Sequence, residues 1–156
     1  MKKQYFSILG VILGLYLVAC QAKTAGIEAR EAWARTANMG GNGAVYLILE
    51  NHSDQADELI GASSDVAQMV EIHKSEVNDQ GVMVMTKQDV ILLPVNEQIQ
   101  LQPGGYHIML MGLRRDLKEG ETFQIVLKFK AHPELTLPVT VRSGGMMDMQ
   151  HESQGN

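Results

Sequence analysis

Three short segments of the chain alternate aliphatic side chains with histidine and methionine. In 69–75, 82–85 and 106–111, one parity carries mainly aliphatic or aromatic residues and the other mainly His and Met. Because successive side chains of a strand point to opposite faces, each segment would turn its imidazoles and thioethers to one side of a sheet. These groups suit a soft monovalent ion, so the pattern predicts a Cu(I) site on a sheet face.

Short strands are the elements that must position these side chains. Most runs with strand character are four to eight residues long and rich in Val, Ile, Leu and aromatics, and Gly-, Asn- and Pro-containing turns separate them. This pattern predicts an all-β fold, an antiparallel Greek-key sandwich or barrel. The predicted strands are 29–35, 44–50, 58–62, 68–74, 82–87, 98–101, 106–111, 122–129 and 135–141.

The turn at 78–81 permits a prediction about register. If the hairpin loop is centred on Asp79, His73 and Met85 are direct cross-strand neighbours, with β-carbons about 4.5 to 5.5 Å apart. A loop centred between Asn78 and Asp79 would instead place the two side chains on opposite faces. His107 and Met109 are two residues apart, so they share a face in either case.

The N-terminal 1–19 read as an export signal, because Lys2 and Lys3 precede an apolar run shorter than a membrane-spanning helix. The signal ends in Leu17-Val18-Ala19-Cys20, which resembles the lipobox of bacterial lipoproteins. This resemblance implies cleavage before Cys20, lipidation of its thiol and a short tether over 20–27. The expected location is the periplasmic side of the envelope, with the outer membrane favoured; the alternative is an ordinary cleaved signal peptide.

Charge and cysteine content narrow the function. Without Lys2 and Lys3, 11 basic residues face 18 acidic ones, a net charge of −7 that disfavours nucleic acid as a partner. Cys20 is the only cysteine, so a lipidated chain has no thiol for a disulfide, a nucleophile or a metal. We also find no catalytic motif and expect no enzyme activity. Met and His are therefore the soft and borderline ligands that remain.

The spacing of these ligands resembles that of a known family. His73 and Lys74 are followed by ten residues, Met85, twenty-one residues and His107-Ile108-Met109. This resembles the H(M)X10MX21HXM motif of the periplasmic copper chaperones called PCu(A)C, with Lys74 in place of the optional Met. Flanking segments resemble the family as well, among them Ala32-Trp33-Ala34-Arg35, Pro103-Gly104-Gly105 and Met111-Gly112-Leu113.

The resemblance implies that His73, Met85, His107 and Met109 bind Cu(I). It also implies a cupredoxin-like domain over 28–142 that supplies copper, above all to the CuA centre of cytochrome c oxidase. The expected partners are a copper-accepting oxidase subunit or another copper chaperone, together with the membrane through the lipid anchor, and we expect a monomer.

The C-terminal 143–156 form a separate candidate. A packed strand is not expected there, and a Met- and His-rich tail reads as a second, weaker copper site that could accept Cu(II) through His151. The alternative is a tail with chance methionine enrichment. The candidate ligands of this second site are Met146, Met147, Met149 and His151.

Other interpretations stay open. The same four-ligand site would serve copper buffering or resistance without delivery. From a different class, the chain could be a lipid-anchored adhesion or protein-binding sandwich with a methionine-rich contact face. Met83 and Met111 read more simply as core fillers, and the alternative is that they support the copper site or act as alternate ligands. Trp33 reads as a core aromatic, or as a residue beside the copper site.

Overall fold

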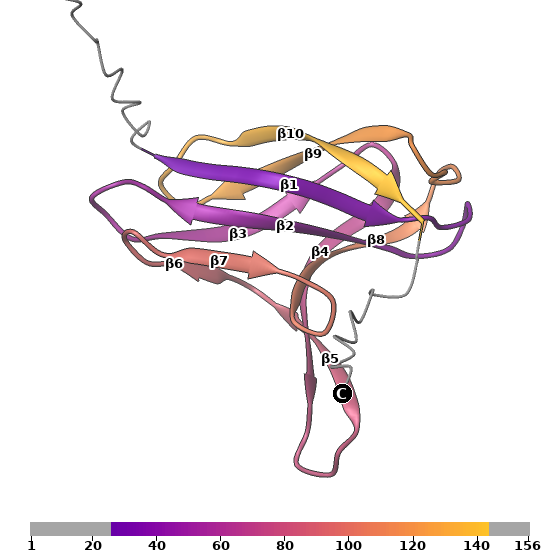
Figure 1. Ribbon diagram of the computed structural model, residues 1–156, viewed down its shortest axis with the longest axis horizontal. Helices are drawn as coiled ribbons and strands as arrows, with labels where there is room; N and C mark the ends of the chain where they lie inside the picture. Colours follow the sequence, from indigo (N-terminus) through magenta and orange to yellow (C-terminus); the bar gives the residue numbers. More distant parts are fainter. Residues whose placement is uncertain (1–25, 144–156) are drawn as a thin grey trace, which may run out of the picture.

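The computed structural model describes residues 26–143, which form ten β-strands and, within that range, no helix (Figure 1). Within these residues, no helix has the length and apolarity needed to cross a membrane. The strands are β1 (Ile27–Arg35), β2 (Gly43–Asn51), β3 (Asp57–Ser63), β4 (Ala67–Val77), β5 (Met83–Gln88), β6 (Ile91–Leu93), β7 (Gln98–Leu101), β8 (Tyr106–Leu113), β9 (Thr122–Phe129) and β10 (Leu135–Arg142).

The strands join into one curved sheet in the order β5-β4-β8-β2-β1-β10-β9-β3-β6, with β7 paired to β2. The pairing of β1 with β10 is parallel, and the other described strand pairs are antiparallel. Figure 1 shows a layered barrel body from which β5 and the adjoining part of β4 project as a hairpin. The predicted all-β fold class is confirmed.

Alternation of inward and outward side chains builds the core. In β9, the side chains of Phe123, Ile125, Leu127 and Phe129 are buried, and the residues between them, which include Val126, face outward. On β8, Ile108 and Leu110 are fully buried, which leaves His107 and Met109 on the opposite face of that strand. Burial of each large aliphatic side chain stabilises the fold by about 1.5–3 kcal/mol.

The nine predicted strands all appear, within a few residues of their expected bounds, and the structure adds β6. This strand is only three residues long and pairs with β3 at the other end of the sheet order from β5. Its Ile91 and Leu93 are buried while Leu92 is 62% exposed. A three-residue run followed by Pro94 is too short to show a period, so the sequence pattern did not reveal it.

The register of the β4–β5 hairpin differs from the prediction. His73 lies opposite Lys87, and Met85 lies opposite Ser75, so the predicted direct pairing of His73 with Met85 is wrong. Both side chains nevertheless share one face, because the shift is by two residues and preserves parity.

The turn explains the shift. The Gly81 N–H donates to the Asn78 carbonyl at 2.9 Å, the Asn78 N–H donates to the Val82 carbonyl at 2.9 Å, and Gly81 has a φ of 75°. These contacts close a three-residue loop centred on Gln80 rather than Asp79. A residue in the left-handed conformation ends such loops, and glycine adopts it without steric cost.

We call residues 75–88 the arm, because β4 pairs with β8 only as far as Lys74 and beyond that point pairs with β5. The arm exposes several apolar side chains to solvent: Val77, Val82, Met83 and Met85 are between 51% and 65% exposed. Met83 is therefore not a core filler, contrary to that prediction. Met111 lies opposite Met69 between β8 and β4 and is half-buried, outside the core.

Candidate metal centre

The pairing of β4 with β8 places the two predicted histidine ligands together. His73 lies directly opposite His107 in this antiparallel pair, so both side chains point to the same face of the sheet. Their ring centroids are 6.0 Å apart, with an angle of 56° between the ring planes. The two residues are 34 positions apart in the chain. They come together only because β4 and β8 are neighbours in the sheet.

His107 is almost fully buried, at 3% exposure, and its orientation is fixed by the backbone. Its Nδ1 lies 3.0 Å from the Gly105 carbonyl oxygen, which can only accept, so Nδ1–H is the donor. The same carbonyl accepts the Ser75 N–H at 3.0 Å, which holds the 103–105 turn against the arm. In the neutral ring, the lone pair is therefore on Nε2 and available to a metal.

His73 has the complementary tautomer. Its Nε2 lies 3.0 Å from Glu71 Oε2, so the neutral ring donates Nε2–H to the carboxylate and carries its lone pair on Nδ1. Nδ1 is buried and has no hydrogen-bond partner among the described residues. A buried nitrogen without a partner is costly in an ordinary protein interior, and a carboxylate on the far nitrogen is the usual support of a metal-binding histidine.

Glu71 is itself held in place. Its Oε1 accepts a hydrogen bond from Lys87 Nζ at 2.7 Å, across the β4–β5 pair. The hydrogen bonds from His73 and then from Lys87 hold the pKa of the Glu71 carboxyl below its usual value. The carboxylate is therefore ionised at neutral pH, and it favours the tautomer that leaves His73 Nδ1 free.

The two predicted methionine ligands lie on the same face. Met109 is two residues from His107 on β8, opposite Glu71, and Met85 is on the arm. A surface hollow of about 420 Å³ is lined by Met85, Met109 and His107, together with Ser75 and Tyr46. Met85 is 51% exposed, whereas Met109 is half-buried. The face thus combines two confined imidazoles with one open and one half-buried thioether.

This donor set determines which ion fits. Two neutral nitrogens and two thioether sulfurs match soft, low-coordinate Cu(I), whereas zinc sites use Cys, His and carboxylate, and calcium requires oxygen ligands. Within residues 26–143, no group of three or more His, Cys, Asp and Glu side chains is arranged to hold a metal ion. The residues present therefore fit Cu(I) better than a hard divalent ion.

An aromatic wall adjoins the imidazoles, and sequence reasoning missed part of it. The Tyr46 ring is 6.3 Å from the His107 ring and 4.6 Å from the Trp33 ring. Trp33 is half-buried and lies outside the buried core, contrary to the prediction of a core aromatic. It contacts Tyr46, and its role beside the copper site stays a prediction. Tyr46 carried no signal in the sequence, because its approach to His107 depends on the pairing of β2 with β8.

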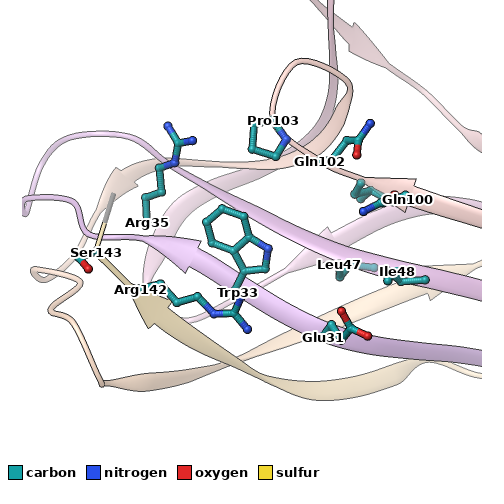
Figure 2. Close-up of a pocket in the computed structure, with 11 residues that line it drawn as sticks. Glu31, Trp33, Arg35, Leu47, Ile48, Gln100, Gln102, Pro103, Arg142 and Ser143 are labelled. Carbon is teal, nitrogen blue, oxygen red and sulfur yellow. The ribbon is translucent and has the colours of Figure 1, made fainter. Parts of the chain in front are cut away.

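A second hollow, of about 380 Å³, lies on the other side of this wall. Figure 2 shows the Trp33 ring in its centre, with the guanidinium groups of Arg35 and Arg142 to either side. Arg35 and Pro103 line both hollows, so the two are neighbours.

Several predicted features lie outside the described residues. These are the signal over 1–19, the lipidated Cys20 and most of its tether, and the second copper site at Met146, Met147, Met149 and His151. They remain predictions.

The chain resembles proteins of known sequence and structure. RP573 of Rickettsia prowazekii (strain Madrid E), an uncharacterised protein, is 37% identical over 116 residues, which are 71% of this chain and 64% of that protein. The match thus spans less than two thirds of that relative's length. The solution structure of CuI-DR1885 from Deinococcus radiodurans is 30% identical, with a TM-score of 0.55 over 81% of this chain and 84% of that one.

A further solved structure, the copper-bound PCuAC domain from PmoF2, has a TM-score of 0.63 at 24% identity and covers 75% of this chain and 92% of that one. At this identity the likeness shows the fold, which is cupredoxin-like. The family model described as "Putative lipoprotein LpqE-like" matches residues 27–141, which is nearly the whole described domain. The chain belongs to the LpqE-like family.

Proposed function

We propose that this protein is an extracytoplasmic Cu(I)-binding metallochaperone, with copper as its cargo and His73, His107, Met85 and Met109 as the ligands. The observation that carries the proposal is the facing pair of imidazoles. In each ring one nitrogen makes a hydrogen bond to the protein, which identifies the other nitrogen as the one that carries the free lone pair. The printed names of the structural relatives, CuI-DR1885 and a copper-bound PCuAC domain, support the same cargo.

The two halves of the site suit acquisition and release. His107 and His73 are confined by Gly105 and Glu71, so they present fixed nitrogens to the ion. Met85 lies on the exposed arm, where a partner's ligand can approach it. A thioether is an uncharged donor, and in this proposal the acceptor's ligand first replaces the open thioether, so that the ion passes over without being released into water.

The destination and location are the finer part of the proposal. We propose that the acceptor is the CuA centre of cytochrome c oxidase, directly or through another copper chaperone. We further propose lipidation at Cys20, attachment on the periplasmic side of the envelope and a preference for the outer membrane. The description of the family as lipoprotein-like supports envelope attachment.

Cu(I) binding is the first test. The chain from residue 21 would be titrated against a competing Cu(I) chelator under anaerobic, reducing conditions, beside alanine variants of the four ligands. We expect one tightly bound ion, with affinity lost in each variant while the far-ultraviolet circular dichroism is unchanged. Met39→Ala and His132→Ala are matched controls, because both residues lie away from the site.

Two outcomes would overturn parts of the proposal. Binding that is indifferent to the four substitutions would reduce the His and Met face to packing and favour the adhesion alternative. Delivery is tested separately, by mixing the copper-loaded chain with a soluble CuA domain and following the CuA absorption spectrum. Tight binding without transfer to CuA or to a second chaperone would favour copper buffering.

A further inference from the structure

The hollow centred on Trp33 has a composition that the copper site does not explain. Its floor is the half-buried indole ring, and Arg142 lies over that ring, with its guanidinium carbon 5.5 Å from the centroid. Arg35 lies on the other side of the ring (Figure 2). Among residues 26–143, no carboxylate forms an ion pair with Arg35 or Arg142, and Glu31, which also lines the hollow, is paired with Arg30 at 3.0 Å.

The backbone is specially shaped to build this hollow. The pairing of β1 with β2 shifts register between Arg30 and Trp33, and Glu31 within that bulge has a φ of 57°. A non-glycine residue rarely adopts this conformation, because it strains the backbone. The bulge changes the parity of β1, and Trp33 then lies opposite Tyr46, with the two rings in tilted contact. The strained bulge therefore places the indole ring between the two arginines.

Two unpaired guanidinium groups beside an aromatic surface fit a ligand that carries carboxylates and apolar side chains together. The formal net charge of the chain is −5, so this basic pair contrasts with the surface as a whole. A segment of that kind begins at the rim. Arg142 and Ser143 both line the hollow, and the chain continues directly as Gly144-Gly145-Met146-Met147-Asp148-Met149-Gln150-His151-Glu152.

We propose that the hollow lined by Trp33, Arg35 and Arg142 is the docking site of the segment 146–152. Asp148 and Glu152 would pair with the arginines, and the methionines would lie on the indole, since thioether sulfur makes favourable contacts with aromatic rings. The segment 144–156 contains no Lys or Arg that would oppose this pairing, and Gly144-Gly145 allow the chain to reverse direction after β10.

The short connection makes weak binding sufficient. A flexible linker of a few residues gives an effective concentration in the millimolar range, so a Kd in trans of about 1 mM or tighter would keep at least about half of the sites occupied. Because Arg35 and Pro103 line both hollows, a docked segment would lie next to the methionine side of the proposed copper site. The position of the docked segment relative to copper rests on the proposed function, but the docking itself does not.

Trp33 is the only tryptophan in the chain, so its fluorescence reports on this hollow alone. The experiment compares the chain from residue 21 with the same chain ending at Ser143, both without copper and in the presence of a chelator. We expect the shortened chain to show a red shift of the emission and a loss of protection from acrylamide. A synthetic peptide of 144–156, added in trans, should reverse both changes, and the reversal should weaken at high salt.

Substitutions in the segment test the ion pairs without touching the hollow. Asp148→Asn with Glu152→Gln in the full-length segment should reproduce the loss of protection, whereas Gln150→Ala, in the same segment, should not. Identical emission and quenching in the long and short chains would overturn the proposal. Equal restoration by acetate alone would also overturn it, because the hollow would then recognise a free carboxylate rather than this segment. Since no copper is present, either failure leaves the proposed Cu(I) function untouched.

Discussion

The barrel body and the arm are held together by different forces, and the proposed copper site has ligands on both. His73, His107 and Met109 are on strands whose other faces carry buried side chains such as Ile72, Ile108 and Leu110. Met85 is on the arm, where apolar residues stay exposed and the ladder to β4 is the main support. The body therefore supplies a fixed pair of imidazoles, and the arm supplies a ligand that can move.

Loss of a buried side chain in the body should produce the largest effect on stability. Leu110→Ala removes a fully buried residue next to the β8 ligands, and we expect it to lower the free energy of unfolding by about 2–5 kcal/mol. Met83→Ala, on the arm, should change it by less than about 0.5 kcal/mol, because the side chain is 65% exposed. Urea denaturation measures both. Equal losses would show that the arm is packed as firmly as the body.

A buried carboxylate gives the body its own pH dependence. Burial acts to raise the pKa of Asp57, but the backbone N–H groups of Glu58, His132 and Ala131 outweigh burial and hold the pKa below its ordinary value. A lowered folded-state pKa stabilises the fold above the unfolded value of 3.8, and this stabilisation is lost as the pH falls through the folded value.

Asp57→Asn should therefore destabilise the protein by about 1–3 kcal/mol at pH 7 and flatten the pH dependence of unfolding below pH 4. Thermal unfolding between pH 2 and pH 7 measures both quantities. Glu58→Gln is the control, because it breaks only the exposed bridge to Lys130. If the loss of stability below pH 4 is unchanged in Asp57→Asn, Asp57 is not its cause.

Glu71 connects the two regions, since it accepts from His73 on the body and from Lys87 on β5. Glu71→Gln keeps the shape of the side chain but removes its charge, and we expect Cu(I) affinity to fall about tenfold with little change in stability. Chelator competition measures the affinity. Glu76 is on the same strand but pairs with Lys74, so the Glu76→Gln variant is the control and should keep its Cu(I) affinity. If both variants bind equally, the carboxylate does not orient His73.

The turn of the arm should give the most local effect. Gly81 has a φ of 75°, so Gly81→Ala forces a side chain into the left-handed region at a cost of about 1 kcal/mol. We expect faster amide hydrogen exchange over 75–85 and a weaker contribution of Met85 to binding, with β8 and β9 unaffected. Gly61→Ala is the matched control, because Gly61 also has open space around its Cα but no positive φ. Accelerated exchange throughout the barrel would mean that the arm is not an independent unit.

What the sequence determined by itself was local. The alternation in 69–75 and 106–111 follows from backbone geometry, so the strands, the all-β class and the shared parity of His107 with Met109 could be predicted. The side-chain types identified the chemistry, since two imidazoles and two thioethers suit Cu(I) wherever they meet.

Only the tertiary structure decided which strands are neighbours and in what register. The pairing of His73 with His107 needs β4 beside β8, and the pairing of His73 with Lys87 rather than Met85 needs the three-residue loop at Gly81. The Trp33 hollow combines residues of β1, β2, β7 and β10, including the parallel β1–β10 pair. Such contacts join residues distant in the chain, and their energies depend on turn conformation and long-range packing, which no local pattern records.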